Sequence, residues 1–210
     1  KTFFELLQLQ FTTGRNTVFE GIERVLPGET LVVGGGKVVE RRKRPALPVG
    51  GTSSWSEAEA LERLERALVD SVMVHQRSDV PYGMFLSGGI DSSVVLALMA
   101  RLNDRPVRAF TAGFCETSVS DERDHARAVA RAVGAEHVEV EFTERDFWTL
   151  LPRIAGVIDD ATADYAVMPT YKLAAEASGD LKVILSGEGG DELFAGYGRY
   201  RSLMRPWWTG

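Results

Sequence analysis

Cysteine is almost absent from this sequence, and Cys115 is the single example. One cysteine cannot form a disulfide within the chain, and such scarcity is typical of proteins from a reducing compartment. Long apolar runs are missing as well, because none approaches the ~20 residues that a membrane span needs, and no secretory signal is visible. We therefore expect a cytoplasmic protein that does not interact with a membrane.

An excess of basic residues is also missing. The 24 Lys and Arg residues are outnumbered by 30 Asp and Glu residues, and the formal net charge is −6. This balance argues against nucleic-acid binding through bulk charge. The basic run at 41–44 is interpreted as the solvated end of a strand rather than a phosphate or nucleic-acid patch. The three histidines show no metal-ligand spacing with one another or with the cysteine.

The most informative stretch is Phe85-Leu86-Ser87-Gly88-Gly89-Ile90-Asp91-Ser92-Ser93. An apolar run at 80–86 precedes it and a helical pattern of apolar residues follows it, so we predict a strand, a glycine turn and a helix. Glycines let a backbone approach a ligand closely, and a new helix directs its free N–H groups and positive dipole end at the turn. The turn is therefore predicted to bind phosphate, with the three serine hydroxyls as additional donors.

This turn differs from the usual nucleotide loop. The pattern Gly-x-x-x-x-Gly-Lys-Ser/Thr is absent, and no lysine lies nearby. The carboxylate of Asp91 stands in the first helical turn instead, and a carboxylate beside a polyphosphate needs a bridging cation, usually Mg²⁺. The alternative is an ordinary tight turn with Asp91 as a helix cap. The stretch is not a serine nucleophile elbow, because that motif, Gly-x-Ser-x-Gly, needs a glycine where this sequence has Phe85.

A second strand–turn–helix pattern lies about a hundred residues later. The apolar run Val183-Ile184-Leu185 leads into Ser186-Gly187-Glu188-Gly189-Gly190-Asp191-Glu192, and a helix is predicted from Leu193. Ligands of an open parallel sheet bind at the carboxyl ends of its strands, where both glycine turns are predicted to lie. Asp91 and Asp191 can therefore converge on one Mg²⁺.

The two stretches resemble motifs of a known family. The segment 86–93 is similar to the pyrophosphate-binding loop of the N-type ATP pyrophosphatases, which are adenine nucleotide alpha-hydrolase-like proteins. The segment from Leu185 to Tyr197, continued by Gly198-Arg199-Tyr200, resembles a signature of the bacterial glutamine-hydrolysing asparagine synthetases. The resemblance covers nearly the whole chain and part of the family's full pattern. It implies an α/β fold with a parallel sheet and helices on both faces, preceded by a β-hairpin remnant of an N-terminal glutaminase domain.

The resemblance also implies a division of the chain. Residues 1–45, with Thr17-Val18-Phe19-Glu20-Gly21-Ile22 before Leu26-Pro27-Gly28, are expected to be the C-terminal remnant of a glutamine amidotransferase domain. Residues 46–54 are the expected linker, and 55–210 the synthetase domain, truncated at its C-terminus. The family's N-terminal nucleophilic cysteine is missing, Lys1 cannot take its role, and the family's late catalytic lysine would lie beyond Gly210. We therefore expect a fragment that does not hydrolyse glutamine and is incomplete alone.

The reaction implied by the resemblance is ATP-dependent amide synthesis. The side-chain carboxylate of aspartate would attack the α-phosphate and release pyrophosphate, and glutamine-derived ammonia would displace AMP to give asparagine. Asp91 and Asp191 would hold Mg²⁺. Glu188 would orient the amine or take its proton; alternatively it only holds the turn. The residues expected to bind ATP are Leu86, Ser87, Gly88, Gly89, Asp91, Ser92, Ser93, Ala112 (beside the adenine), Ser186 and Gly187.

The sequence leaves the identity of the acceptor acid open. Bacterial members of the family often have Asp-Glu-Pro where this chain has Asp159-Asp160-Ala161, in a loop that borders the acceptor site. One alternative is a related adenylating amidotransferase acting on another carboxylate, either β-lactam synthetase-like or modifying peptides or polysaccharides. Another is a non-catalytic ATP-binding module, against which the two intact motifs argue. The expected partners are small-molecule substrates, with a homodimer as an open alternative.

Local patterns predict the remaining elements. A capping box, Ser56 with Glu59, begins a helix, and Gly134 ends another. Residues 3–9 form either a short helix or a strand, and His137 is interpreted as a polar residue at a strand end. The other predicted elements are a hairpin of 30–33 with 37–40, strands at 107–114 and 137–142, and helices at 121–133, 147–157 and 168–177.

Overall fold

The computed structural model of the chain describes residues 2–45, 49–51, 53–115, 121–159, 161, 164–198 and 200. The expected linker at 46–54 lies partly outside these residues, and Asp160 and Arg199 lie outside them altogether. The chain forms two compact units, Lys1–Trp55 with Leu151–Ala166, and Ser56–Leu150 with Val167–Gly210. The assignment of 1–45 to a glutaminase domain stays a prediction.

The first unit contains the predicted hairpin. Helix α1 (Thr2–Leu9) precedes strands β1 (Glu29–Gly34) and β2 (Lys37–Lys43), which pair antiparallel from Glu29 opposite Lys43 to Gly34 opposite Lys37. Gly35 and Gly36 form the turn with φ of 56° and 73°, a conformation that tight hairpins need and glycine adopts without strain. The hairpin is thus confirmed, and the basic run lies at the end of β2.

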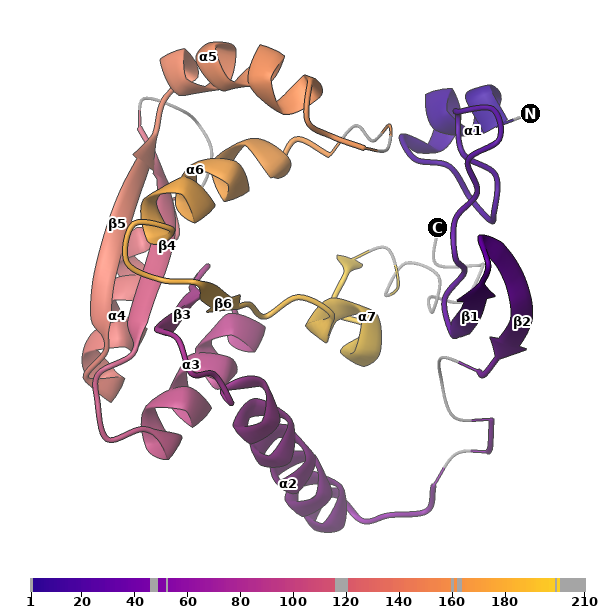
Figure 1. Cartoon of the computed structure of the whole chain (residues 1–210). Helices are drawn as coiled ribbons and strands as arrows, with labels where there is room; N and C mark the ends of the chain where they lie inside the picture. The colour runs from indigo at the N-terminus through magenta and orange to yellow at the C-terminus, as the bar shows by residue number, and fades with distance from the viewer. Residues whose placement is uncertain are drawn as a thin grey trace, which may run out of the picture. The chain divides into compact units, whose positions relative to one another are not determined.

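The second unit is built on a four-stranded parallel sheet. Its strands are β3 (Tyr82–Phe85), β4 (Arg108–Phe114), β5 (Glu136–Phe142) and β6 (Val183–Leu185), in the order β5-β4-β3-β6. The chain builds outward from β3 to β5 and then returns to the other side of β3 with β6 (Figure 1). The strand order therefore reverses between β3 and β6, the position where such sheets bind ligands.

Helices cover both faces of this sheet, as the sequence predicts. Ala109 and Phe110 are neighbours on β4 and point to opposite faces, since side chains alternate along a strand. Ala109 packs in a core cluster with α2 (Glu57–His75), α3 (Ile90–Leu102) and α4 (Arg123–Val133). Phe110 packs on the opposite face with α6 (Val167–Ala177), and Figure 1 shows α4 and α6 on either side of β4 and β5. The predicted α/β fold is confirmed.

Local chemistry explains where the helices begin and end. The capping box of α2 is present, with Glu59 N donating to Ser56 Oγ at 3.3 Å and Ser56 N donating to Glu59 Oε2 at 2.9 Å. Gly134 ends α4 with φ of 68°. Helix α5 (Glu144–Ala155) begins three residues before its predicted start at residue 147, because Thr143 and Asp146 form a second reciprocal cap.

The helix that follows the second glycine turn corrects one prediction. Helix α7 (Gly190–Phe194) begins three residues before Leu193, where the sequence pattern placed its start. Gly189 is its N-cap and has φ of 95°, which lets the chain turn directly from the glycine loop into the helix. Among the described residues, no helix is both long enough and apolar enough to cross a membrane.

Candidate functional site

The first glycine turn follows β3 directly. Leu86 N still donates to Phe110 O on β4 at 2.8 Å, so the turn leaves the sheet only after Leu86. Gly88 then has φ of 82°, and a Cβ there would stand 3.2 Å from both Ala126 N and Glu122 O. Only glycine fits this position without strain, because the turn both takes a left-handed conformation and packs against the start of α4.

Serine hydroxyls hold the turn in shape. Ser87 Oγ and Ser92 Oγ are 3.0 Å apart, and Ser93 Oγ donates to Gly89 O at 2.7 Å. Ser92 is buried, whereas Ser87 is exposed. Among the residues that the structure describes, no side chain caps the start of α3, whose N-cap is Gly89. The first amides of α3 therefore lack a side-chain cap, which is the arrangement that suits an anion.

The second glycine turn packs directly on the first. A Cβ on Gly187 would stand 2.7 Å from Ser92 N and 3.0 Å from Ser92 Cα. A Cβ on Gly190 would overlap the carboxylate of Asp91. The two strands that precede these turns are paired, with Met84 opposite Leu185, so the two motifs, far apart in sequence, form one contact surface at the carboxyl ends of β3 and β6.

The expected metal ligands lie in the first turns of α3 and α7, directly after these adjoining glycine turns. The Asp91 carboxylate lies against Gly190, the residue before Asp191, and both aspartates are half-buried. No group of three or more His, Cys, Asp or Glu side chains poised for a metal occurs in the described part of the chain. Mg²⁺ in a nucleotide site usually takes one or two carboxylates and completes its shell with phosphate oxygens and water.

The remaining predicted residues lie around the same end of the sheet. Ser186 and Glu188 are exposed on the second turn. Ala112 lies on β4 and packs against the cluster that contains Phe110. The structure thus brings residues 86–93 together with 186–190, while the individual binding and catalytic roles stay predictions.

Two residues that the sequence pattern did not assign to the site lie directly beneath the first turn. Thr111 on β4 is 2% exposed and donates from Oγ1 to Leu86 O at 2.6 Å. His137 on β5 lies 2.8 Å from the same hydroxyl through Nε2, and its side chain is 9% exposed. Burial lowers the pKa of His137. The available signal was one polar residue inside the apolar run of β4, and its partner could not be inferred from spacing.

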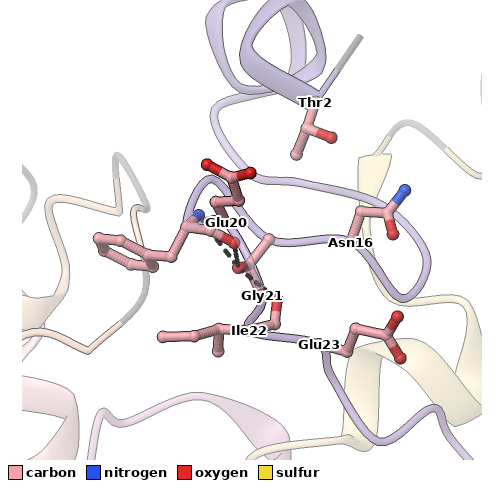
Figure 2. Close-up of a pocket in the computed structure, with 8 residues that line it drawn as sticks. Thr2, Asn16, Glu20, Gly21, Ile22 and Glu23 are labelled. Carbon is pink, nitrogen blue, oxygen red and sulfur yellow. Dashed lines mark hydrogen bonds between the residues drawn. The ribbon is translucent and has the colours of Figure 1, made fainter.

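The first unit has a hollow of its own. It has a volume of about 330 Å³ and is lined by Thr2, Asn16, Thr17, Phe19, Glu20, Gly21, Ile22 and Glu23. Figure 2 shows the polar ends of Asn16, Glu20 and Glu23 among these lining side chains. None of the predicted site residues lines it.

Comparison with known proteins gives a consistent picture. A family model described as asparagine synthase matches residues 63–210. A putative glutamine-hydrolysing asparagine synthetase of Mycobacterium tuberculosis is 37% identical over 203 residues, which cover 94% of this chain and 31% of that protein. The glutamine-hydrolysing asparagine synthetase 1 of Bacillus subtilis is 35% identical, and the match covers 95% of this chain and 31% of that protein. An amidase of Penicillium rubens, chyE, is 32% identical, and the match covers 89% of this chain and 30% of that protein.

A likeness to a solved structure is weaker. An NH3-dependent NAD synthetase from Campylobacter jejuni, in complex with nitrate, has a TM-score of 0.44 and 17% identity, covering 65% of this chain and 60% of that one. The chain spans about a third of the length of the curated relatives it matches. Because the family model matches well over half of the sequence, the chain belongs to the asparagine synthase family.

Proposed function

We propose that this chain carries the ATP-binding part of an enzyme that converts a carboxylate to an amide through an acyl-adenylate. The observation that supports this most strongly is the contact between the two glycine turns at the carboxyl ends of β3 and β6. That position is the switch point of the sheet, where α/β proteins bind their ligands. Family membership supplies the expected chemistry.

The first turn would hold the β- and γ-phosphates of ATP. The start of α3 has no side-chain cap, so its backbone N–H groups can donate to phosphate oxygens. The exposed hydroxyl of Ser87 lies on the same turn. Ser186 and Gly187 would contact the nucleotide from the second turn. Ala112, on the neighbouring strand β4, would read the edge of the adenine through its backbone.

The residues present fit a magnesium ion. Asp91 and Asp191 directly follow turns that touch, and two carboxylates beside a polyphosphate repel it unless a cation lies between them. Mg²⁺ bound there would neutralise negative charge on the pyrophosphate as it leaves. The chain's own contribution is to hold both carboxylates and to aim the N–H groups of the turn at the same oxygens.

The proposed reaction has two steps. The acceptor carboxylate attacks the α-phosphorus, and pyrophosphate leaves with the electrons of the broken P–O bond. Ammonia then attacks the acyl carbon, loses a proton, and AMP leaves with one of the original carboxylate oxygens. Glu188 is exposed on the second glycine turn and would orient the amine or accept that proton.

Aspartate is the first candidate acceptor, because the Mycobacterium and Bacillus relatives are named as asparagine synthetases. The ammonia would then come from glutamine, as the names of those relatives also say. A second candidate is a related enzyme with another carboxylate as acceptor. It is favoured by the Penicillium relative, which is named an amidase, and by Ala161, where the family often has proline. A cytoplasmic location is part of the proposal, since the single cysteine suits a reducing compartment.

The test follows the carboxylate oxygen. The full-length protein is incubated with ATP, Mg²⁺, ammonium chloride and L-aspartate carrying ¹⁸O in its side-chain carboxylate. The proposal predicts pyrophosphate, asparagine and AMP that contains one ¹⁸O atom. Glutamate, one methylene longer, is the matched control substrate. Formation of ADP and phosphate, or AMP without label, contradicts the adenylation step. Labelled AMP with an acid other than aspartate identifies the second candidate.

A further inference from the structure

A series of hydrogen bonds runs from β5 to the end of β3, beneath the first glycine turn (residues 86–93), which we call the phosphate turn. The hydroxyl of Thr111 donates to Leu86 O at 2.6 Å, so its single proton is committed to that carbonyl. His137 Nε2, 2.8 Å from the same oxygen, must therefore be the donor in the second bond. This assigns the Nε2–H form to the imidazole. Thr111 and Leu86 are 2% and 1% exposed, so water does not substitute for either partner.

The carbonyl that accepts this bond belongs to the first peptide of the turn. A trans peptide is planar, with its C=O and N–H pointing in opposite directions, and the described residues contain no cis bond. Holding Leu86 O against Thr111 therefore directs Ser87 N away from β4. There it donates to Ser92 Oγ at 3.3 Å, at the start of α3. The orientation of this one peptide links β4 to the helix that would face the phosphates.

An ion pair lies beside the outer end of these hydrogen bonds, next to His137. His137 Nδ1 lies 3.6 Å from Glu139 Oε1, beyond hydrogen-bond distance. Glu139 is engaged by Arg127 of α4 through two bonds, Nε to Oε1 at 2.8 Å and Nη2 to Oε2 at 3.0 Å. Burial disfavours the charged imidazole and lowers the pKa of His137, and Arg127 offsets the opposing pull of the Glu139 carboxylate. His137 thus stays a neutral donor to Thr111.

We propose that Thr111 and His137 are positioning residues for the phosphate turn, fixing the Leu86–Ser87 peptide so that the turn is preformed for the polyphosphate of the nucleotide. This inference rests on the proposed function for the identity of the ligand. Neither residue touches the nucleotide in this account. Both act through the Leu86 carbonyl, and each lies on a strand other than the one that carries the turn.

The experiment compares single substitutions in the full-length protein. Thr111→Val keeps the shape and removes the hydroxyl, whereas Thr111→Ser keeps it. His137→Leu removes the ring donor, whereas His137→Gln places an N–H near the position of Nε2. Tyr82→Phe is the matched control, because it removes a hydroxyl that contacts Gln76 and Asn103 at the opposite end of β3.

Two readouts are measured for each variant: affinity for Mg²⁺-ATP, and amide hydrogen exchange of residues 86–93 without nucleotide. Thr111→Val should weaken ATP binding about tenfold, the effect expected from one lost buried hydrogen bond, and should speed exchange in the turn. His137→Leu should act in the same direction. Thr111→Ser and His137→Gln should restore both readouts to within about twofold of the wild type, and Tyr82→Phe should leave both unchanged.

Thermal unfolding of the same variants separates positioning from general stability. Thr111→Val and Tyr82→Phe are both expected to lower Tm, so a loss of ATP affinity in Thr111→Val alone supports positioning. Equal ATP affinity and equal exchange in these two variants overturns the inference. A wild-type protein that does not bind Mg²⁺-ATP refutes the proposed function instead, and the exchange data then decide whether Thr111 and His137 order the turn.

Discussion

Substitution of Gly187 by alanine tests whether the two glycine turns form one site. The new Cβ would stand 2.7 Å from Ser92 N, about 0.7 Å closer than the 3.4 Å at which ordinary contact begins. The atoms it meets are backbone atoms of Ser92 and Asp91, which cannot rotate away. The turns must therefore part by several tenths of an ångström, or the start of α3 must shift.

Both consequences can be measured. Overpacking of this kind costs about 1–3 kcal/mol, and Tm falls by about 2–4 °C for each kcal/mol in a protein of this size. A displacement approaching 1 Å in a site that holds a reacting group lowers activity by about 10- to 100-fold. We therefore expect Gly187→Ala to lose Mg²⁺-ATP affinity and pyrophosphate release well beyond its loss of stability.

Gly179→Ala is the matched control for this substitution. Its Cβ would meet only Glu176 O, at an ordinary 3.5 Å, so its ATP affinity should equal that of the wild type. Isothermal titration with Mg²⁺-ATP and thermal unfolding are run on both variants. If Gly187→Ala binds Mg²⁺-ATP as tightly as Gly179→Ala, the turns do not act as one site and the reasoning is refuted.

Three further substitutions test other parts of the account. Asp91→Asn should remove the Mg²⁺-dependent part of ATP affinity, about 10- to 100-fold, and an unchanged Mg²⁺ dependence would exclude Asp91 as a ligand. Gly88→Val should cost about 1–3 kcal/mol in urea unfolding, because φ of 82° strains a branched residue; wild-type stability and ATP affinity would contradict the fit described for this turn. The hydrogen bond from Lys172 lowers the pKa of Asp146 to about 2, below its unfolded value of ~3.9, so the contribution is present above about pH 4 and is lost as pH falls towards 2. Asp146→Asn should therefore cost about 1 kcal/mol at pH 7, after allowance for solvent screening, and the difference from the wild type should vanish near pH 2; a difference independent of pH would show that the carboxylate charge plays no part.

Sequence patterns predicted the elements of the second unit well because each depends on neighbours within a few residues. Mainly apolar runs indicated β3, β4 and β6, an alternating pattern indicated β5, and the Ser56–Glu59 box and Gly134 placed the ends of two helices. The patterns failed where a short-range cap went unnoticed, as with Thr143 at the start of α5. They failed again where a backbone conformation decided the outcome, as with Gly189 at the start of α7.

The site itself was predictable in part. The two motifs and the rule for open parallel sheets were enough to place both turns at the carboxyl ends of strands. The depth of their contact, with no room for a side chain on Gly187 or Gly190, depends on the pairing of β3 with β6 and could not be derived from either motif. The hydrogen bond between Thr111 and His137 joins residues 26 positions apart, and periodicity carries no information on such a pair.

The most direct test of the central claim measures hydrogen exchange of the full-length protein with and without Mg²⁺-ATP. The account predicts that the nucleotide protects residues 86–93 and 186–190 together, and that Asp91→Asn weakens protection of both segments. Protection of only one segment, or of neither at saturating nucleotide, would contradict the claim that the two glycine turns form a single ATP site.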